Sequence, residues 1–144
     1  MNIKTYAAFN ETDPLGPYTI ERRQIQANDV AIDIEYCGVC HSDIHTAKGD
    51  WGRPNYPVVP GHEIIGRVKE VGAEVTKFKA GDLVGVGCMV ESCKSCDPCN
   101  HGIEQYCENG FTGTYNSKKS KYGGITYGGY SEYIVVEEDF VLSV

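Results

Sequence analysis

Apolar and polar residues alternate over several short stretches of the chain, as they do in β-strands that bury one face. Over residues 30–37, positions 30, 32, 34 and 36 are apolar or aromatic and share one face, while positions 33 and 35 are acidic. Similar runs predict strands at residues 64–71, 82–86 and 130–136. Residues 5–9 are expected to form an N-terminal strand that pairs with one of these. The fold is therefore expected to be mainly β.

One short helix and one irregular lobe complete the predicted organisation. Residues 42–48 are the best candidate for a helical turn, with Ser42 as its N-cap and Gly49 as its C-terminal stop. Residues 88–109 carry few apolar side chains, so they are expected to leave a small β-barrel as a lobe that a metal ion organises. No internal repeat or low-complexity segment interrupts this plan.

Composition and charge exclude several classes of protein. A length of 144 residues corresponds to about one domain, and a net charge of −7 argues against nucleic acid as a partner. No stretch approaches the roughly 18 apolar residues of a membrane span, and the N-terminal residues lack a signal-peptide pattern. Seven cysteines, an odd number, suit thiols in a reducing cytoplasm better than a disulfide framework.

Four cysteines in one polar stretch give the strongest chemical signal: Cys93, Cys96, Cys99 and Cys107. Gaps of two residues let a tight turn direct successive sulfurs at one centre, and the longer last gap brings the loop back. Zinc prefers four such soft ligands at tetrahedral corners, and a site closed by four thiolates is structural. The alternative is a disulfide loop or unlinked thiols. We expect a structural zinc.

A second cluster combines Cys37, Cys40 and the following residues with Gly61-His62-Glu63. A strand that ends at Cys37 delivers Cys40, and a turn delivers His62 just before the next strand, so two strand ends could place a thiolate and an imidazole on one ion. Two cysteines with one histidine are a known set for catalytic zinc. By spacing alone the alternatives stay open: Cys37 and Cys40 could be a redox pair, and His62 an ordinary polar residue.

The motif that begins at Gly61 resembles the signature of zinc-containing alcohol dehydrogenases, with glycines at 61, 66 and 72, His62, Glu63 and Val75. The runs at residues 37–43, 84–88 and 128–131 are similar to the cinnamyl-alcohol-dehydrogenase branch, which includes bacterial aldehyde reductases. This resemblance spans nearly the whole chain. It implies a GroES-like β-barrel with short helices and a zinc-stabilised cysteine lobe.

The resemblance also implies ligands for a catalytic zinc. Cys40 and His62 match two of its ligands, and Glu63 matches an acid that approaches the metal or stays beside it to balance charge. Asp43 matches the carboxylate that orients the ligand histidine, a role compatible with stabilising the start of a helix. Zinc that holds an alcohol lowers the pKa of its hydroxyl.

Other residues match the proton path and the ligand-binding surfaces of the family. Ser42 and His45 match a relay that carries the alcohol proton to solvent, unless Ser42 only caps the helix and His45 is a surface residue. His41 matches a contact to the cofactor pyrophosphate. Trp51 matches the wall of the substrate cleft, or is an anchor of the core or loop. Cys37 and Cys88 are expected to be structural thiols.

The sequence departs from the family in two respects. The third cysteine ligand of the catalytic zinc follows Cys107 in relatives, and this chain has no further cysteine. It also lacks a G-x-G-x-x-G dinucleotide-binding motif. Residues 1–144 are therefore expected to be the catalytic domain of a longer enzyme, without its Rossmann domain. In this chain alone the catalytic site is expected to be empty, filled by water or completed by Glu63.

The resemblance implies that the full enzyme interconverts small primary alcohols and aldehydes with NADP(H) or NAD(H), as a homodimer or homotetramer in the cytoplasm. The residues 1–144 alone are expected to turn over nothing. Two alternatives are a stand-alone zinc-binding interaction module and a zinc-independent relative of quinone reductases. The joint presence of the candidate ligands and relay residues disfavours both.

Overall fold

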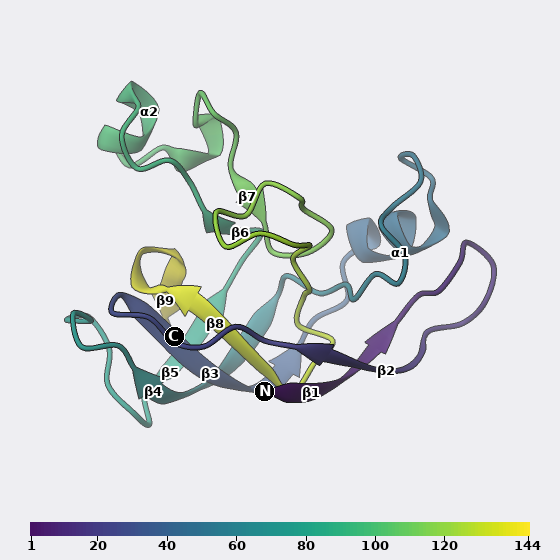
Figure 1. The fold of residues 1–144 in the computed structure, drawn as a ribbon, viewed down its shortest axis with the longest axis horizontal. Coiled ribbons are helices and arrows are strands. Elements are labelled where there is room, and N and C mark those ends of the chain that lie inside the picture. The colour runs from purple at the N-terminus through teal and green to yellow at the C-terminus, as the bar shows by residue number, and fades with distance from the viewer.

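The computed structural model describes residues 1–144, and its largest element is a curled antiparallel sheet of five strands in the order β8-β3-β4-β5-β9 (Figure 1). These strands are β3 (Asp29–Cys37), β4 (Ile64–Val71), β5 (Leu83–Val86), β8 (Tyr133–Glu137) and β9 (Val141–Ser143). Two smaller sheets pair β1 (Asn2–Ala7) with β2 (Gly16–Glu21) and β6 (Met89–Glu91) with β7 (Thr112–Gly113). The prediction of a mainly β fold is confirmed.

The main core is formed where apolar side chains of all five strands of the sheet meet. Eleven buried residues form it, and Val30, Ile32, Val84 and Val136 are almost completely buried. A second cluster joins β1 and β2 to the turn before β4, through Ile3, Ala7, Ile20 and Val59.

The alternation predicted along β3 holds for only part of the strand. Residues 29–32 are all buried, although successive side chains of a strand point to opposite faces, and Tyr36 is 72% exposed. The prediction that Tyr36 shares the core face is wrong. Its pairing with β4 shifts register between Ile34 and Tyr36, and such a bulge turns the end of a strand away from its earlier face.

The other predicted strands are found with shifted ends. The strand at residues 64–71 has the predicted bounds, and β8 begins at Tyr133 because residues 130–132 turn to meet β1. The amide of Tyr6 donates to the Tyr130 carbonyl at 2.9 Å, and Thr5 forms a bridge with Ser131. The N-terminal strand covers residues 2–7 rather than 5–9, and it pairs with β2, a strand that the sequence did not indicate.

Helix α1 (His41–Lys48) begins one residue before the predicted start. The N-cap is Cys40, so the prediction that Ser42 caps the helix is wrong. Asp43 causes the difference, because its carboxylate accepts the Cys40 backbone N–H at 2.9 Å and closes the first turn from inside. Gly49 ends the helix at a φ of 72°, as predicted. Cys40 therefore lies where the chain passes from β3 into α1.

The lobe at residues 88–109 projects from the sheet and contains α2 (Asp97–Asn100) and the 3₁₀ turn η1 (Glu104–Tyr106) (Figure 1). Beyond Glu91, its only buried side chains are Cys99 and Cys107. The lobe thus has no apolar core of its own. None of the helices in the chain is long and apolar enough to cross a membrane.

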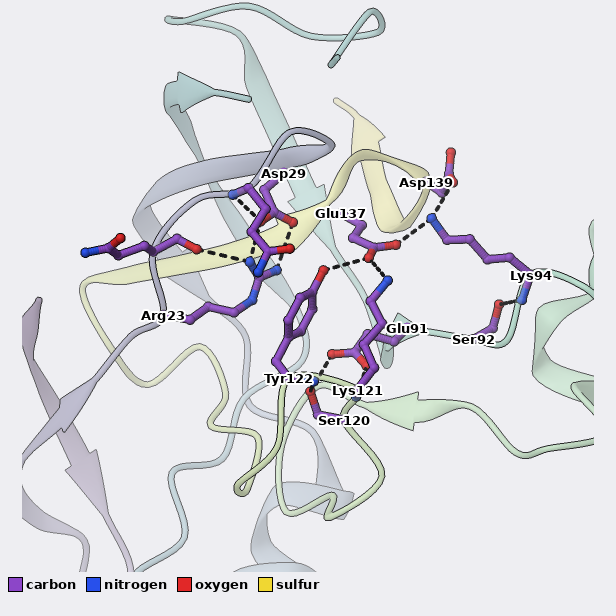
Figure 2. A network of polar contacts seen from close by, with 12 residues as sticks. Arg23, Asp29, Glu91, Ser92, Lys94, Ser120, Lys121, Tyr122, Glu137 and Asp139 are labelled. Atoms are coloured by element: carbon purple, nitrogen blue, oxygen red, sulfur yellow. Dashed lines mark hydrogen bonds and ion pairs between the residues drawn. The ribbon is translucent and has the colours of Figure 1, made fainter. Parts of the chain in front are cut away.

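A buried carboxylate ties the lobe and the 114–130 segment to the sheet (Figure 2). Glu137, at the end of β8, receives the Lys94 ammonium of the lobe at 2.5 Å and the Tyr122 hydroxyl at 2.8 Å, and it also pairs with Lys121. Although burial alone would raise it, hydrogen bonds from Lys121, Lys94 and Tyr122 lower the pKa of Glu137 to about 2. The carboxylate is therefore charged at neutral pH. Asp139, in the 3₁₀ turn η2 (Glu138–Phe140), accepts a further bond from Lys94 at 2.8 Å.

Candidate active site and metal centres

The sulfur atoms of the four cysteines in the lobe meet at one point. All four lie within 4.8 Å of one another, with Cys93 Sγ 3.9 Å from Cys99 Sγ and Cys96 Sγ 4.0 Å from Cys107 Sγ. Zinc–sulfur bonds of about 2.3 Å at tetrahedral corners place neighbouring sulfurs about 3.8 Å apart. A disulfide would need about 2 Å. The spacing therefore fits a bound zinc ion, and the disulfide loop considered from the sequence is not formed.

Local hydrogen bonds prepare this four-cysteine site for a cation. The backbone and side chain of Ser95, followed by the Cys96 amide and the Asn109 side chain, lower the pKa of Cys93 to about 5. Burial and contacts with the Cys96 and Cys107 thiols raise the pKa of Cys99 to about 11, although the Ser92 hydroxyl opposes this. The Cys93 thiol therefore loses its proton more readily than the Cys99 thiol. Binding of a divalent cation would release the remaining protons.

A second group of ligand atoms lies between the β3–α1 junction and the start of β4. One ligand atom each of Cys40, His62 and Glu63 lies within 4.8 Å of the others. Thiolate, imidazole and carboxylate are all zinc ligands, so the donor set fits that metal. We call this group the Cys40 site. Gly61 is required beside it, because its φ is 101° and an added Cβ would lie 2.9 Å from the Tyr130 backbone nitrogen.

The buried carboxylate of Asp43 connects the two segments that carry these ligands. It is only 2% exposed and accepts the backbone N–H groups of Cys40 and Gly61, each at 2.9 Å, and the Tyr130 hydroxyl at 3.2 Å. It makes no hydrogen bond to the His62 ring. The resemblance assigned Asp43 to orienting that ring. In the structure its bonds fix the backbone on either side of the site, and it also lies in the first turn of α1.

The two predicted relay residues lie on one face of α1, three positions apart. Ser42 Oγ is 3.3 Å from His62 Nε2, so the hydroxyl borders the Cys40 site. His45 Nδ1 is 2.8 Å from Asp50 Oδ2. A carboxylate only accepts, so Nδ1 carries the hydrogen and Nε2 is left free to take a proton. Asp50 was not singled out in the sequence, where only its position just after Gly49 could have indicated it.

His41 and Trp51 flank His45 at the surface. The His41 and His45 rings stack with centroids 5.9 Å apart, and the Trp51 ring lies 5.0 Å from His45. Trp51 is 68% exposed, so the alternative that it anchors the core is wrong. The three rings form an exposed aromatic ridge beside the relay. The contacts with pyrophosphate and substrate expected of His41 and Trp51 stay predictions.

The two cysteines outside both sites differ from each other. Burial raises the pKa of Cys37 to about 11, so its thiol stays protonated at neutral pH and is a poor redox partner for Cys40. Cys37 packs against the main core, as expected of a structural thiol. Cys88 is exposed, so burial does not support the expectation that it is a structural thiol.

Two further residues complete the Cys40 site: Tyr115, for which the sequence motifs gave no signal, and Gly38, which lies within the run at residues 37–43. Tyr115 stacks on His62 with ring centroids 5.6 Å apart and planes 15° from parallel. Burial raises the pKa of Tyr115 to about 12, so the phenol stays protonated. Gly38 makes room for Glu63, because an added Cβ at residue 38 would lie 2.1 Å from Glu63 Oε2.

Comparison with known proteins places this architecture in a family. Residues 26–144 match the model of the alcohol dehydrogenase GroES-like domain, and the chain belongs to that family. It is 58% identical over 142 residues to the NADP-dependent alcohol dehydrogenase C of Mycobacterium bovis, with 99% of this chain and 41% of the relative covered. It is 53% identical over 144 residues to the aldehyde reductase YahK of Escherichia coli, with 100% of this chain and 41% of the relative covered.

A solved structure agrees with these relatives. The chain superposes on the CAD from Helicobacter pylori complexed with NADP(H) with a TM-score of 0.95 and 46% identity, which covers 100% of this chain and 42% of that one. The predicted GroES-like fold and the resemblance to the cinnamyl-alcohol-dehydrogenase and aldehyde-reductase branch are therefore confirmed. The chain spans about two fifths of the length of the relatives it matches.

Proposed function

We propose that this chain is the zinc-binding catalytic domain of an enzyme that interconverts primary alcohols and aldehydes by hydride transfer with NADP(H). One observation carries the proposal: Cys40, His62 and Glu63 bring ligand atoms within 4.8 Å of one another, with Ser42 Oγ 3.3 Å from the His62 ring. A site for metal and a hydroxyl beside it are the parts that such chemistry needs at this end of the enzyme.

The residues of the Cys40 site would each have a separate task. Cys40, His62 and Glu63 would hold a catalytic zinc, which supplies Lewis acidity that lowers the pKa of a bound alcohol. Asp43 keeps the backbone of the two ligand segments at a fixed separation through the amides of Cys40 and Gly61. The four cysteines of the lobe would hold a second, structural zinc with no open position.

The proton path would begin at Ser42 and end at His45. Ser42 Oγ borders the metal ligands and can take a proton from a substrate hydroxyl while passing its own onward. His45 lies one turn along α1, and Asp50 fixes its ring so that Nε2 is the accepting atom. The His45 side chain is 39% exposed, so a proton held there has access to solvent.

The proposal extends to parts of the enzyme beyond this domain. Residues 1–144 would be its catalytic domain, with residues 88–109 as the structural-zinc lobe, and the nicotinamide would be bound by a Rossmann domain in a further segment. NADP(H) is favoured because the relatives' names include an NADP-dependent dehydrogenase and a complex with NADP(H). His41 would contact the pyrophosphate, and Trp51 would line the substrate cleft. A cytoplasmic homodimer or homotetramer is part of the same proposal.

Cobalt substitution of the 144-residue chain tests the two sites separately. The chain is expected to hold one ion with high affinity in the four-cysteine site and a second with lower affinity in the Cys40 site. Cys40→Ser should remove the thiolate-to-cobalt absorption of the second ion only, while Cys88→Ser, a change at an exposed cysteine, should leave both. A chain that binds one ion in total, whatever the cobalt concentration, would favour a zinc-stabilised binding module instead.

Turnover tests the enzyme itself. The proposed full-length enzyme, about as long as the relatives, is expected to oxidise NADPH in the presence of an aromatic aldehyde. Residues 1–144 alone are expected to show no such activity. Ser42→Ala should lower kcat of the extended protein by about 10²-fold or more, because it removes a positioned proton-transfer group. Full activity in that variant would exclude the proposed proton path.

A further inference from the structure

The orientation of the His62 ring has an unusual basis in this structure. A histidine that binds a metal usually donates its second ring N–H to a carboxylate or a carbonyl, which fixes the plane of the ring. The only hydrogen-bond partner of His62 is Ser42, at Nε2. Asp43, the carboxylate expected to orient the ring, is occupied by two backbone amides and Tyr130. Another group must therefore define the plane of the imidazole.

Tyr115 covers the face of that imidazole. The centroid distance of 5.6 Å and interplanar angle of 15° are those of an offset stack, one of the preferred arrangements of aromatic pairs. Burial raises the pKa of the Tyr115 hydroxyl, and Thr46, Asp43 and Ser42 of α1 also act on that pKa. The Tyr115 ring therefore contacts the candidate metal ligand directly.

The backbone on both sides of Tyr115 is held firmly. The Thr114 amide donates to the Cys88 carbonyl at 3.1 Å. Asn116 adopts a φ of 57°. Its side-chain oxygen accepts the Asn55 backbone N–H at 2.9 Å, and its backbone N–H donates to the Thr126 carbonyl at 2.9 Å. Because both neighbours are tied to different parts of the fold, the tyrosine ring is presented to His62 in a fixed position.

We propose that Tyr115 is a positioning residue that sets the plane of the His62 imidazole by stacking on its face. The inference rests on the proposed function for its effect on metal binding. The stacking contact itself involves only Tyr115 and His62 and does not depend on the proposed function. The stack replaces the hydrogen bond that would otherwise orient a metal-binding histidine.

Two variants separate the ring from the hydroxyl. Tyr115→Leu removes the stack and keeps an apolar side chain, whereas Tyr115→Phe keeps the stack and removes the hydroxyl. Tyr106→Leu, a change at a 69% exposed tyrosine of the lobe, is the matched control. Co²⁺ titration of the 144-residue chain is expected to show about tenfold weaker binding at the Cys40 site for Tyr115→Leu, and less than threefold for Tyr115→Phe and the control. Binding at the four-cysteine site should not change.

A second readout does not depend on metal. In the metal-free chain, the His62 ring protons should show an upfield ring-current shift that Tyr115→Leu abolishes and Tyr115→Phe retains. If the parent binds no second Co²⁺, the proposed metal site fails, and the His62 resonances alone decide the positioning role. Unchanged His62 resonances in a folded Tyr115→Leu chain would overturn the inference. If that variant does not fold, an absence of Overhauser contacts between the Tyr115 and His62 rings in the parent would overturn it as well.

Discussion

Replacement of Glu137 by glutamine tests the polar contacts that tie the lobe to the sheet. Glutamine has the shape of the protonated acid and lacks its charge, so Glu137→Gln leaves the ammonium groups of Lys94 and Lys121 without their buried partner (Figure 2). The Glu137 side chain is only 5% exposed, so solvent screens these contacts little. The variant should therefore lose stability rather than merely rearrange a surface.

The magnitude follows from the pKa of Glu137, which falls from 4.5 to about 2 in the folded chain. At about 1.4 kcal/mol per pKa unit, this difference corresponds to about 3 kcal/mol of folding free energy at neutral pH. Because the folded-state pKa is the lower one, the contribution is complete above pH 4.5 and declines as the pH falls toward 2. At pH 3 about 1.4 kcal/mol should remain.

Urea denaturation at pH 7 and pH 3 measures both values. The parent and Glu137→Gln are compared in the same zinc-containing buffer at each pH, so proton uptake by the cysteines is common to both. Glu74→Gln, at an exposed carboxylate without an ion pair, is the control and should change the free energy of unfolding by less than about 0.5 kcal/mol. A difference below about 1 kcal/mol at pH 7, or one that does not shrink by pH 3, would refute the reasoning.

Three further changes test other parts of the structure. Gly38→Ala should displace the Glu63 carboxylate and weaken Co²⁺ binding at the Cys40 site by about tenfold in a titration. Gly87→Ala, where an added Cβ meets no atom within 4 Å, should leave this affinity unchanged. Equal Co²⁺ affinities of the two variants would contradict the prediction. Chelation of zinc should increase hydrogen exchange across residues 92–109 before the strands of the sheet exchange, because that part of the lobe buries only cysteines; unchanged protection there would show that the lobe is stable without metal. Trp51→Ala should leave the melting temperature within about 2 °C of the parent, because the residue is 68% exposed; a larger loss would mean that the aromatic ridge supports the fold.

The sequence predicted those strands that carry a sustained run of apolar residues. The strand at residues 64–71 was predicted with its observed bounds, because its alternation continues without a bulge on the side facing β5. Strand β2 was missed, since Gly16-Pro17 reads as a turn and only Ile20 of this strand is buried. The position of Tyr36 could not be predicted either, because a register shift depends on the partner strand and leaves no mark in the pattern.

The candidate ligands were predictable for a different reason. Cys40 and Asp43 occur in one short motif and His62 and Glu63 in another, so local spacing together with the family resemblance was enough to name them. The helix start was harder, because Ser42 and Asp43 are both common near helix N-termini and only the structure shows which one closes the first turn.

The groups that orient the ligands come from parts of the chain with no motif. Tyr115 lies 53 positions after His62, and Tyr130 is 87 positions from the carboxylate that it contacts. Nothing in the sequence distinguishes these two tyrosines from the others, because tyrosine is the commonest aromatic residue of this chain, with 10 copies. A metal site needs its ligands to have fixed directions as well as suitable atoms. In this domain the two motifs supply the ligand atoms. The 114–130 segment, which the Lys121–Glu137 ion pair ties to the sheet, helps to orient these ligands. Loss of the ion pairs at Glu137 should therefore weaken metal binding at the Cys40 site as well as stability, although the two lie in different regions of the fold.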